Sequence, residues 1–159
     1  MYTGNNSRRG ESVLVVARWV SLTVFLAEAV ALFFSIAYLD MEWLLVAVNG
    51  LLATGVSEAL KRGLKDPRPI NACNCNFLNL GGSVGGRPGM PSGHMATAVA
   101  IAATLWSTKL GTPMSLALFI VWVVSVAWSR VVLGCHTMYQ VGGGALVGLV
   151  LVLLVRYLY

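Results

Sequence analysis

Long stretches without charge are the feature of this sequence that most restricts its fold. The 21 residues between Arg18 and Asp40 contain one charged side chain, Glu28, and the 20 residues between Lys109 and Arg130 contain none. About 20 apolar residues in a helix cross the hydrocarbon core of a bilayer. These lengths therefore predict transmembrane helices, and Glu28, near the middle of the first one, is expected to face protein rather than lipid.

The composition supports the same conclusion. Of the 159 residues, 57% are hydrophobic and only 11% are charged, and the mean hydropathy is +0.77. Soluble domains of this size are rarely so apolar. We predict an all-α, polytopic membrane helix bundle that forms a single domain over residues 1–159, with residues 1–12 as a flexible N-terminal arm. Five transmembrane helices are expected within residues 19–39, 43–60, 91–110, 110–129 and 137–155. In the last of these, the spacing of Gly144 and Gly148 favours close helix packing.

A polar segment separates the predicted second and third helices. Pro67 and Pro69 end any helix there, and residues 70–89 form a long loop rich in Gly and Asn. Loops of this length are usually functional or disordered. Pro91 cannot continue a helix from upstream, and Ser92 is a good N-cap. The third helix is therefore expected to begin here, with free backbone N–H groups that favour an anion.

The predicted helices bring scattered cations and histidines to one membrane face. With five spans, the second helix ends on the side where the third begins, and the fourth ends where the fifth begins. Five residues, including both histidines of the chain, are therefore expected on the side of the N-terminus: Lys61, Arg68, His94, Arg130 and His136. Such a cluster suits an anionic group such as a phosphate. The plainer alternatives are cations that snorkel to the membrane edge and a capped helix with an incidental histidine.

Three short motifs occur in this part of the chain. Lys61 is followed after six residues by Arg68-Pro69, then comes Pro91-Ser92-Gly93-His94, and Ser129-Arg130 is followed after five residues by His136. Together they resemble the type 2 phosphatidic acid phosphatase superfamily, which hydrolyses lipid phosphates and pyrophosphates at membrane surfaces. The resemblance covers roughly residues 61–148, and the three motifs occur in the order and at the spacing of that family.

One position differs from the family pattern. Four residues after His136 the family usually has an aspartate, and this chain has Gln140. The run from Cys135 to Val141 is similar to the dolichyl-diphosphatase branch, in which a glutamine occupies that place. This detail implies a polyisoprenyl pyrophosphate as the substrate.

The resemblance implies a role for each motif residue. His136 is expected to be the nucleophile that forms a phosphohistidine, and Gln140, one helical turn later, is expected to orient its ring. His94 is expected to be the general acid for the leaving group. The arginines are able to hold phosphate oxygens bidentately. The residues expected to bind the phosphate are Lys61, Arg68, Pro69, Ser92, Gly93 and Arg130.

Few carboxylates accompany these cations: only Glu58 and Asp66 are expected on the same membrane face. Glu58 is also spaced to pair with Lys61 or Arg62 on a helix. Metal-assisted chemistry usually needs more carboxylates, so we expect a metal-independent enzyme without a cofactor. Its expected partners are the lipid phosphate or pyrophosphate and membrane lipids, not nucleic acid. A chain this short is also compatible with a homodimer.

Other classes of protein fit part of the sequence. One is a catalytically impaired protein that only binds lipid phosphate, because this chain has all the phosphate-binding residues of the family but lacks its aspartate. Only a measurement of turnover distinguishes such a protein from the enzyme. Another is a small transporter or structural membrane protein. Charged residues would then be expected at both membrane faces, whereas most charged residues of this chain are expected at one face. Within the enzyme class, a phosphatidate-type monoester phosphatase is the alternative to a pyrophosphatase.

The sequence contains opposing signals for orientation. Outside the predicted site, more lysines and arginines are expected on the side of the N-terminus than on the other side. This excess favours a cytoplasmic location for the side of the N-terminus. The family resemblance implies instead a lumenal or periplasmic active site, in the endoplasmic reticulum or a bacterial inner membrane. Asn5-Asn6-Ser7 is a glycosylation sequon on that side. The three cysteines, Cys73, Cys75 and Cys135, match neither a disulfide framework nor a zinc pattern, and Cys73 and Cys75 are too close to pair easily with each other.

Overall fold

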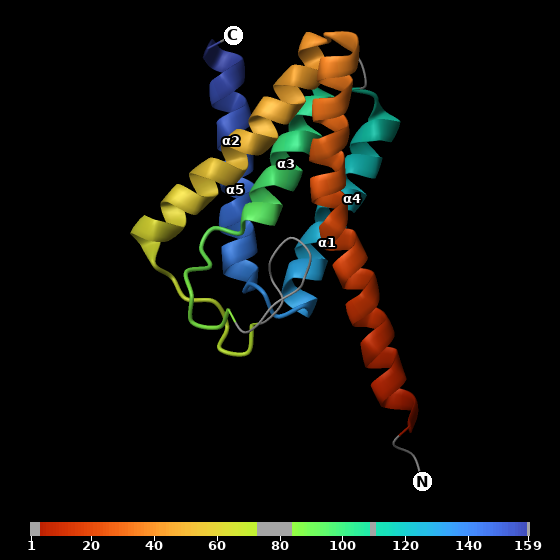
Figure 1. The fold of residues 1–159 in the computed structure, drawn as a ribbon, viewed down its shortest axis with the longest axis vertical. Helices are drawn as coiled ribbons and strands as arrows, with labels where there is room; N and C mark the ends of the chain where they lie inside the picture. Colours follow the sequence, from red (N-terminus) through yellow and green to blue (C-terminus); the bar gives the residue numbers. More distant parts are fainter. Residues whose placement is uncertain (1–3, 73–83, 109–110, 159) are drawn as a thin grey trace.

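The protein is a bundle of helices. The computed structural model describes residues 4–72, 84–108 and 111–158. The helices are α1 (Gly4–Tyr38), α2 (Met41–Leu64), α3 (Gly93–Trp106), α4 (Pro113–Val132) and α5 (Met138–Leu158). Within the described ranges, β-structure is limited to one isolated bridge between Pro67 and Pro88. The predicted all-α fold is confirmed (Figure 1).

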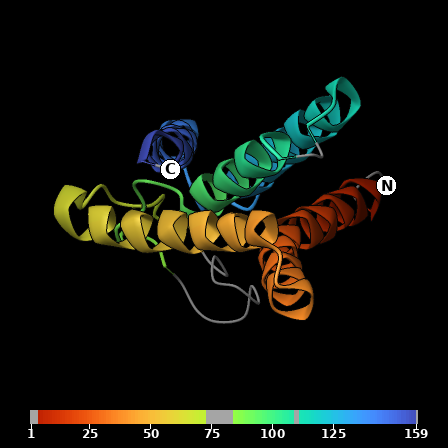
Figure 2. The ribbon, with the colours of Figure 1, turned by 90° about the horizontal axis from the view of Figure 1, so that it is seen from above.

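Four of the helices are long and apolar enough to cross a membrane, so the protein is a multi-pass integral membrane protein. These are α2, α4, α5 and the part of α1 from Gly10 to Tyr38. The fifth, α3, has only 14 residues, which is about 21 Å of helix. It contacts all four other helices and lies inside the bundle, where protein surrounds it (Figure 1). Seen from above, α5 is nearly end-on while α2 lies almost across the view, so α2 is strongly tilted (Figure 2).

The start of the first helix and the end of the third differ from the sequence-based expectation. The first helix begins at Gly4, where we predicted a flexible arm over residues 1–12, because a hydrophobic helix propagates outward through a segment that lacks proline. The third helix ends at Trp106, and the backbone N–H of Ser107 bonds to Ala103 O. The predicted end at Leu110 lies outside the described residues.

Local chemistry fixes the other helix ends. The Asp40 side chain accepts a hydrogen bond of 2.7 Å from the Glu42 N–H and begins α2. A capping box between Thr112 and Ser115 begins α4. After α4, Gly134 adopts φ +66°, a left-handed conformation that glycine adopts without strain. The chain therefore turns sharply between α4 and α5.

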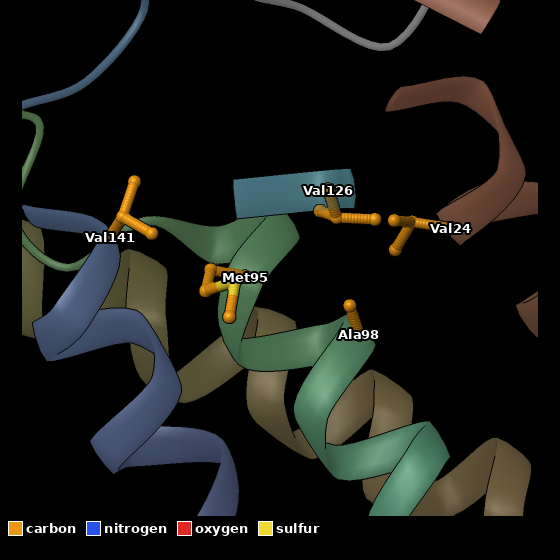
Figure 3. Packing of buried hydrophobic residues seen from close by; sticks show 5 residues of the cluster. All are labelled: Val24, Met95, Ala98, Val126 and Val141. Carbon is orange, nitrogen blue, oxygen red and sulfur yellow. The ribbon is translucent and has the colours of Figure 1, made fainter. Parts of the chain in front are cut away.

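Small residues allow α3 to lie close to its neighbours. Its alanines 96, 98, 100 and 102 are buried. On α5, a Cβ added to Gly144 would lie 2.4 Å from Ser92 O, and one added to Gly148 would lie 2.3 Å from Ala96 O. The predicted close packing at these two glycines is confirmed. Met95 and Ala98 of α3 also pack with Val24, Val126 and Val141 from three other helices (Figure 3).

Glu28 faces protein, as expected for a carboxyl group within a membrane span. Its Oε1 atom is buried and lies 3.3 Å from the place where a Cβ on Gly50 of α2 would be. The missing side chain at Gly50 therefore makes room for this group between α1 and α2.

The contact between α3 and α5 gives a matched pair of stability tests. Gly148→Ala is expected to lower the thermal midpoint of the detergent-purified protein by several degrees, because the new methyl group meets the α3 backbone and overpacking costs about 1–3 kcal/mol. Gly142→Ala is the control. No atom lies within 4 Å of its added Cβ, and alanine favours a helix, so its midpoint is expected to stay level or rise. Equal midpoints for the two variants would contradict the contact.

Candidate active site

The ends of four helices meet at one end of the bundle, the end at which the N-terminus lies (Figure 1). They surround a cavity of about 240 Å³. Five of the predicted site residues line it: Lys61 from α2, Arg68 from the following loop, Gly93 and His94 from α3, and His136 from the turn before α5. Val24, Phe25, Thr54, Glu58 and Thr97 line it as well. The structure thus brings together residues that are far apart in the sequence.

His136 is the most enclosed titratable group of the cavity outside the helices, and it is only 3% exposed. Its backbone N–H donates to Arg130 O at 3.2 Å, which ties the turn to the end of α4. Burial, followed by the neighbouring charges of Arg68, Arg130 and Lys61, lowers the pKa of the His136 imidazole to about 3, although a hydrogen bond with Gln140 acts in the opposite direction. His136 is therefore neutral at neutral pH.

Gln140 lies one turn after His136, as predicted. Its Oε1 atom is 3.2 Å from His136 Nδ1, and its side chain is fully buried. Its backbone carbonyl also accepts a 3.0 Å hydrogen bond from the Ser92 N–H. Gln140 therefore connects the start of α5 with both the turn that carries His136 and the loop that begins α3.

Arg68 is held in place by the loop that precedes α3. Its N–H donates to Arg87 O at 2.8 Å, and its own carbonyl accepts from the Gly86 N–H at 3.3 Å. Burial lowers the pKa of its guanidinium, Glu58 raises it and Arg87 lowers it. An arginine begins with so high a pKa that it stays cationic.

Several buried polar atoms around the cavity have no hydrogen-bond partner among the described residues. They are Arg68 Nη1, Ser92 Oγ and His94 Nε2. Buried polar atoms normally have partners, so this end of the bundle is built to receive a ligand with several hydrogen-bonding oxygens. The His94 ring itself is fixed by an edge-to-face contact with Phe25, with centroids 4.9 Å apart.

The remaining predicted residues lie behind the cavity wall or beside it. Arg130 is fully buried and donates from Nη1 to Ser21 Oγ on α1 at 2.8 Å. Ser92 occupies the N-cap position of α3 and is fully buried outside the lining, and its hydroxyl makes no capping bond. Pro69 is half-buried outside the lining, and its carbonyl accepts from the Ala72 N–H. Lys61 pairs with Glu58, which confirms the predicted ion pair.

Sequence reasoning did not find the contributions of α1 and of the threonines. Phe25 holds His94, and Thr54 on α2 shares a 2.8 Å hydrogen bond with Thr97 on α3. A phenylalanine in an apolar helix carries no signal of its own. Two threonines in predicted spans are a weak signal, because a threonine in a helix commonly bonds to its own backbone.

Cys135 differs from expectation, because it is disulfide-bonded. The predicted absence of a disulfide framework is therefore wrong at this residue. Close spacing argues only against a bridge between Cys73 and Cys75, and both of these cysteines lie outside the described residues. The bond constrains the residue directly before His136.

A family model described as the PAP2 superfamily matches residues 42–159. The match includes α2 to α5 and all three motifs. The chain belongs to the PAP2 superfamily. Members of this superfamily are phosphatases, and with its membrane-spanning helices the protein is a membrane lipid phosphatase, a phosphoric-ester hydrolase. No curated protein and no solved structure matches the chain. The matched region of this PAP2 protein begins after α1, so Phe25 lies outside it.

The low pKa of His136 predicts how the protein titrates. Between about pH 8 and pH 5, His136 is expected to stay neutral, whereas an unperturbed imidazole becomes protonated near 6.5. Nitrogen NMR of the full chain labelled at histidine measures this directly, and His94→Ala assigns the signals because the chain has only two histidines. Protonation of His136 with a midpoint near 6.5 would contradict its burial among cations.

Proposed function

We propose that the protein hydrolyses a lipid phosphate or a polyisoprenyl, dolichyl-type pyrophosphate through a phosphohistidine on His136, without a metal ion. The observation that carries this proposal is a neutral, buried histidine in a cavity lined by cations. A nucleophilic imidazole has to be unprotonated, and burial keeps it so.

The cations take the place that a metal ion has in many phosphatases. Lys61 and Arg68 line the cavity, and the charge of Arg130 lowers the pKa of His136. A phosphate group repels nucleophiles by its charge, and positive groups placed around it neutralise that charge in the transition state. Arg68 Nη1 and Ser92 Oγ, both buried without a partner in the described residues, add hydrogen bonds to its oxygens.

Attack by His136 transfers the phosphoryl group. The lone pair of Nε2 forms the N–P bond while the P–O bond to the leaving group breaks, and the electron pair stays on the leaving oxygen. His94 donates a proton to that oxygen. A water molecule then attacks the phosphohistidine, gives a proton back to His94 and releases phosphate, so that neutral His136 is restored.

His94 suits the role of general acid once substrate is bound. Its Nε2 lies in the cavity region without a partner among the described residues. Burial and the surrounding cations disfavour a protonated imidazole in the empty site, but a bound phosphate dianion favours it. Protonation of His94 and binding of the substrate therefore support each other.

The substrate class follows from two features. Val24 and Phe25 give the cavity an apolar side next to its cations, which suits a phosphate attached to a hydrocarbon chain. Gln140 in place of the usual aspartate supports the pyrophosphatase branch over a phosphatidate-type monoester phosphatase. The same amide favours the second candidate function, an impaired enzyme that binds lipid phosphate, because an amide does not stabilise an imidazolium by charge.

Release of inorganic phosphate from a panel of lipid mono- and diphosphates tests this function. The detergent-purified protein is expected to hydrolyse at least one of them with EDTA present, and a phosphohistidine trapped in acid-free conditions is expected on Nε2. His136→Ala is expected to abolish turnover. His94→Ala is expected to retain activity toward substrates with good leaving groups, which need no proton.

The control is Arg156→Gln, which removes an exposed cation from the opposite end of the bundle and is expected to leave the rate unchanged. Loss of activity on chelation with recovery in Mg²⁺ would refute the metal-free mechanism. Wild-type rates in both histidine variants would refute the assigned roles. Binding of lipid phosphate without any turnover would leave the impaired binder as the function.

For the orientation, we propose that the active-site face lies in the lumen or periplasm. The disulfide at Cys135 supports this side, because disulfides persist in oxidising compartments. In microsomes, the sequon at Asn5 is then expected to carry a glycan, and an engineered sequon in a C-terminal extension is not, since the two termini lie at opposite ends of the bundle (Figure 1). Asn5→Gln is the control. Glycan on the C-terminal extension alone would reverse the orientation.

A further inference from the structure

The side chain of Gln140 makes four hydrogen bonds, although it is fully buried. Its Oε1 atom lies 3.2 Å from His136 Nδ1 and accepts from the Thr137 N–H at 3.3 Å. Its Nε2 atom donates to Asp66 Oδ2 at 2.5 Å and to Pro67 O at 2.9 Å. A primary amide has two donor hydrogens and two acceptor lone pairs, so its hydrogen-bonding capacity is filled.

This network fixes which end of the amide faces the histidine. Thr137 N–H is only a donor and Pro67 O is only an acceptor, so a flipped amide would lose both bonds. The oxygen therefore faces His136, and Nδ1 has to carry the hydrogen of that contact. The proton on Nδ1 leaves the lone pair on Nε2, the nitrogen that the proposed mechanism uses.

The amide also joins His136 to a carboxylate that is distant in sequence. Asp66 precedes the Arg68 motif by two residues and follows α2, whereas Gln140 lies in the first turn of α5. In PAP2 proteins with an aspartate at position 140, the carboxylate would meet the histidine directly. Here the carboxylate is one amide further away, and hydrogen bonds in such a chain polarise one another.

We infer that Asp66 is a positioning residue for the nucleophile, which acts on His136 through the amide of Gln140 and replaces the aspartate that the third motif lacks. This inference rests on the proposed function. The negative charge of Asp66 orients the amide and makes its oxygen a better acceptor for the Nδ1–H. During attack that proton stays on Nδ1, and the positive charge that develops on the ring is opposed by the polarised amide.

Other charges surround His136 and set the background for this effect. Arg68, Arg130 and Lys61 are the cations that act on its imidazole, and His94 lies across the cavity. These groups favour the neutral ring before attack. Asp66, through Gln140, is the described carboxylate connected by hydrogen bonds to the Nδ1 side, so it stabilises charge that appears only during the reaction.

A double-mutant cycle between Asp66 and Gln140 tests the inference. Asp66→Asn removes the charge and keeps the shape, and it is expected to lower kcat roughly tenfold with little change in KM, as outer partners of a site commonly do. The backbone bond from Gly89 N to Asp66 O, 2.7 Å long, does not depend on the side chain and should hold the loop in place.

Gln140→Asp places two carboxylates against each other, where they have to share a proton. Its rate is expected to fall more than tenfold at neutral pH and to recover partly as the pH is lowered. In the Asp66→Asn/Gln140→Asp protein, the new amide at position 66 donates to the new carboxylate at position 140. The rate is expected to rise at least tenfold over Gln140→Asp alone, and His136 to titrate at higher pH than in the wild type.

Nitrogen NMR of His136 in the four full-length proteins supplies a readout that needs no turnover. The wild type is expected to carry its proton on Nδ1, and Asp66→Asn to keep it there but to weaken its bond to Gln140 Oε1, which moves the Nδ1 signal. If no lipid phosphate is hydrolysed but this pattern is seen, the relay stands and the proposed enzyme fails. If hydrolysis occurs but the four proteins share one Nδ1 signal and one titration, the relay is overturned.

The sign of the coupling separates a relay from a merely structural contact. A structural role predicts that Asp66→Asn harms the wild type and Gln140→Asp alike, which would overturn the inference. Asp40→Asn is the matched control. The Asp40 side chain likewise accepts a hydrogen bond next to a helix end, in its case from the Glu42 N–H, but at the opposite end of the bundle. The same change there is therefore expected to leave both the rate and the His136 signals unaltered.

Discussion

The close approach of α5 to α3 is the contact on which the rest of the site depends. A Cβ on Gly144 would lie 2.4 Å from Ser92 O, so the second turn of α5 rests directly on the residue that precedes α3. Ser92 in turn donates from its N–H to Gln140 O. This contact places the helix that follows His136 beside the helix that carries His94, and without it the two histidines would not share one cavity.

The second constraint is electrostatic. The cavity gathers Lys61 and Arg68 next to two histidines, and the ion pair from Glu58 to Lys61 compensates one of these charges. Like charges held in a poorly solvated place repel one another. An anion that binds in the empty site relieves this repulsion, so its binding is favoured. Burial and the same cations that attract a phosphate keep His136 unprotonated. Binding of the substrate and activation of the nucleophile therefore both depend on these cations.

The replacement of an aspartate by Gln140 is understandable in this field. A carboxylate next to His136 would raise the pKa of the imidazole, whereas an amide orients the ring with little effect on its charge. Placing the carboxylate of Asp66 behind the amide keeps a negative group near the nucleophile. The loop of the first motif, the start of α3 and the start of α5 are thereby joined at one buried side chain.

The sequence alone determined the class of fold and the end of the bundle at which the site lies. Uncharged stretches of about 20 residues permit little except membrane helices, and counting them places Lys61, Arg68, His94 and His136 on one side. The helical rule for residues four apart also predicted the contact of Gln140 with His136, although His136 lies in the turn just before α5. The pairing of Glu58 with Lys61 followed from the same rule.

Tertiary structure decided the features that depend on contacts between distant segments. Phe25 reaches His94 from α1, and Asp66 meets Gln140 across 74 positions; neither partner is marked by spacing or composition. The helical start of α1 at Gly4 and the early end of α3 at Trp106 also differ from the sequence pattern. Hydropathy reports how apolar a segment is, but packing decides where its helix stops and which buried groups meet.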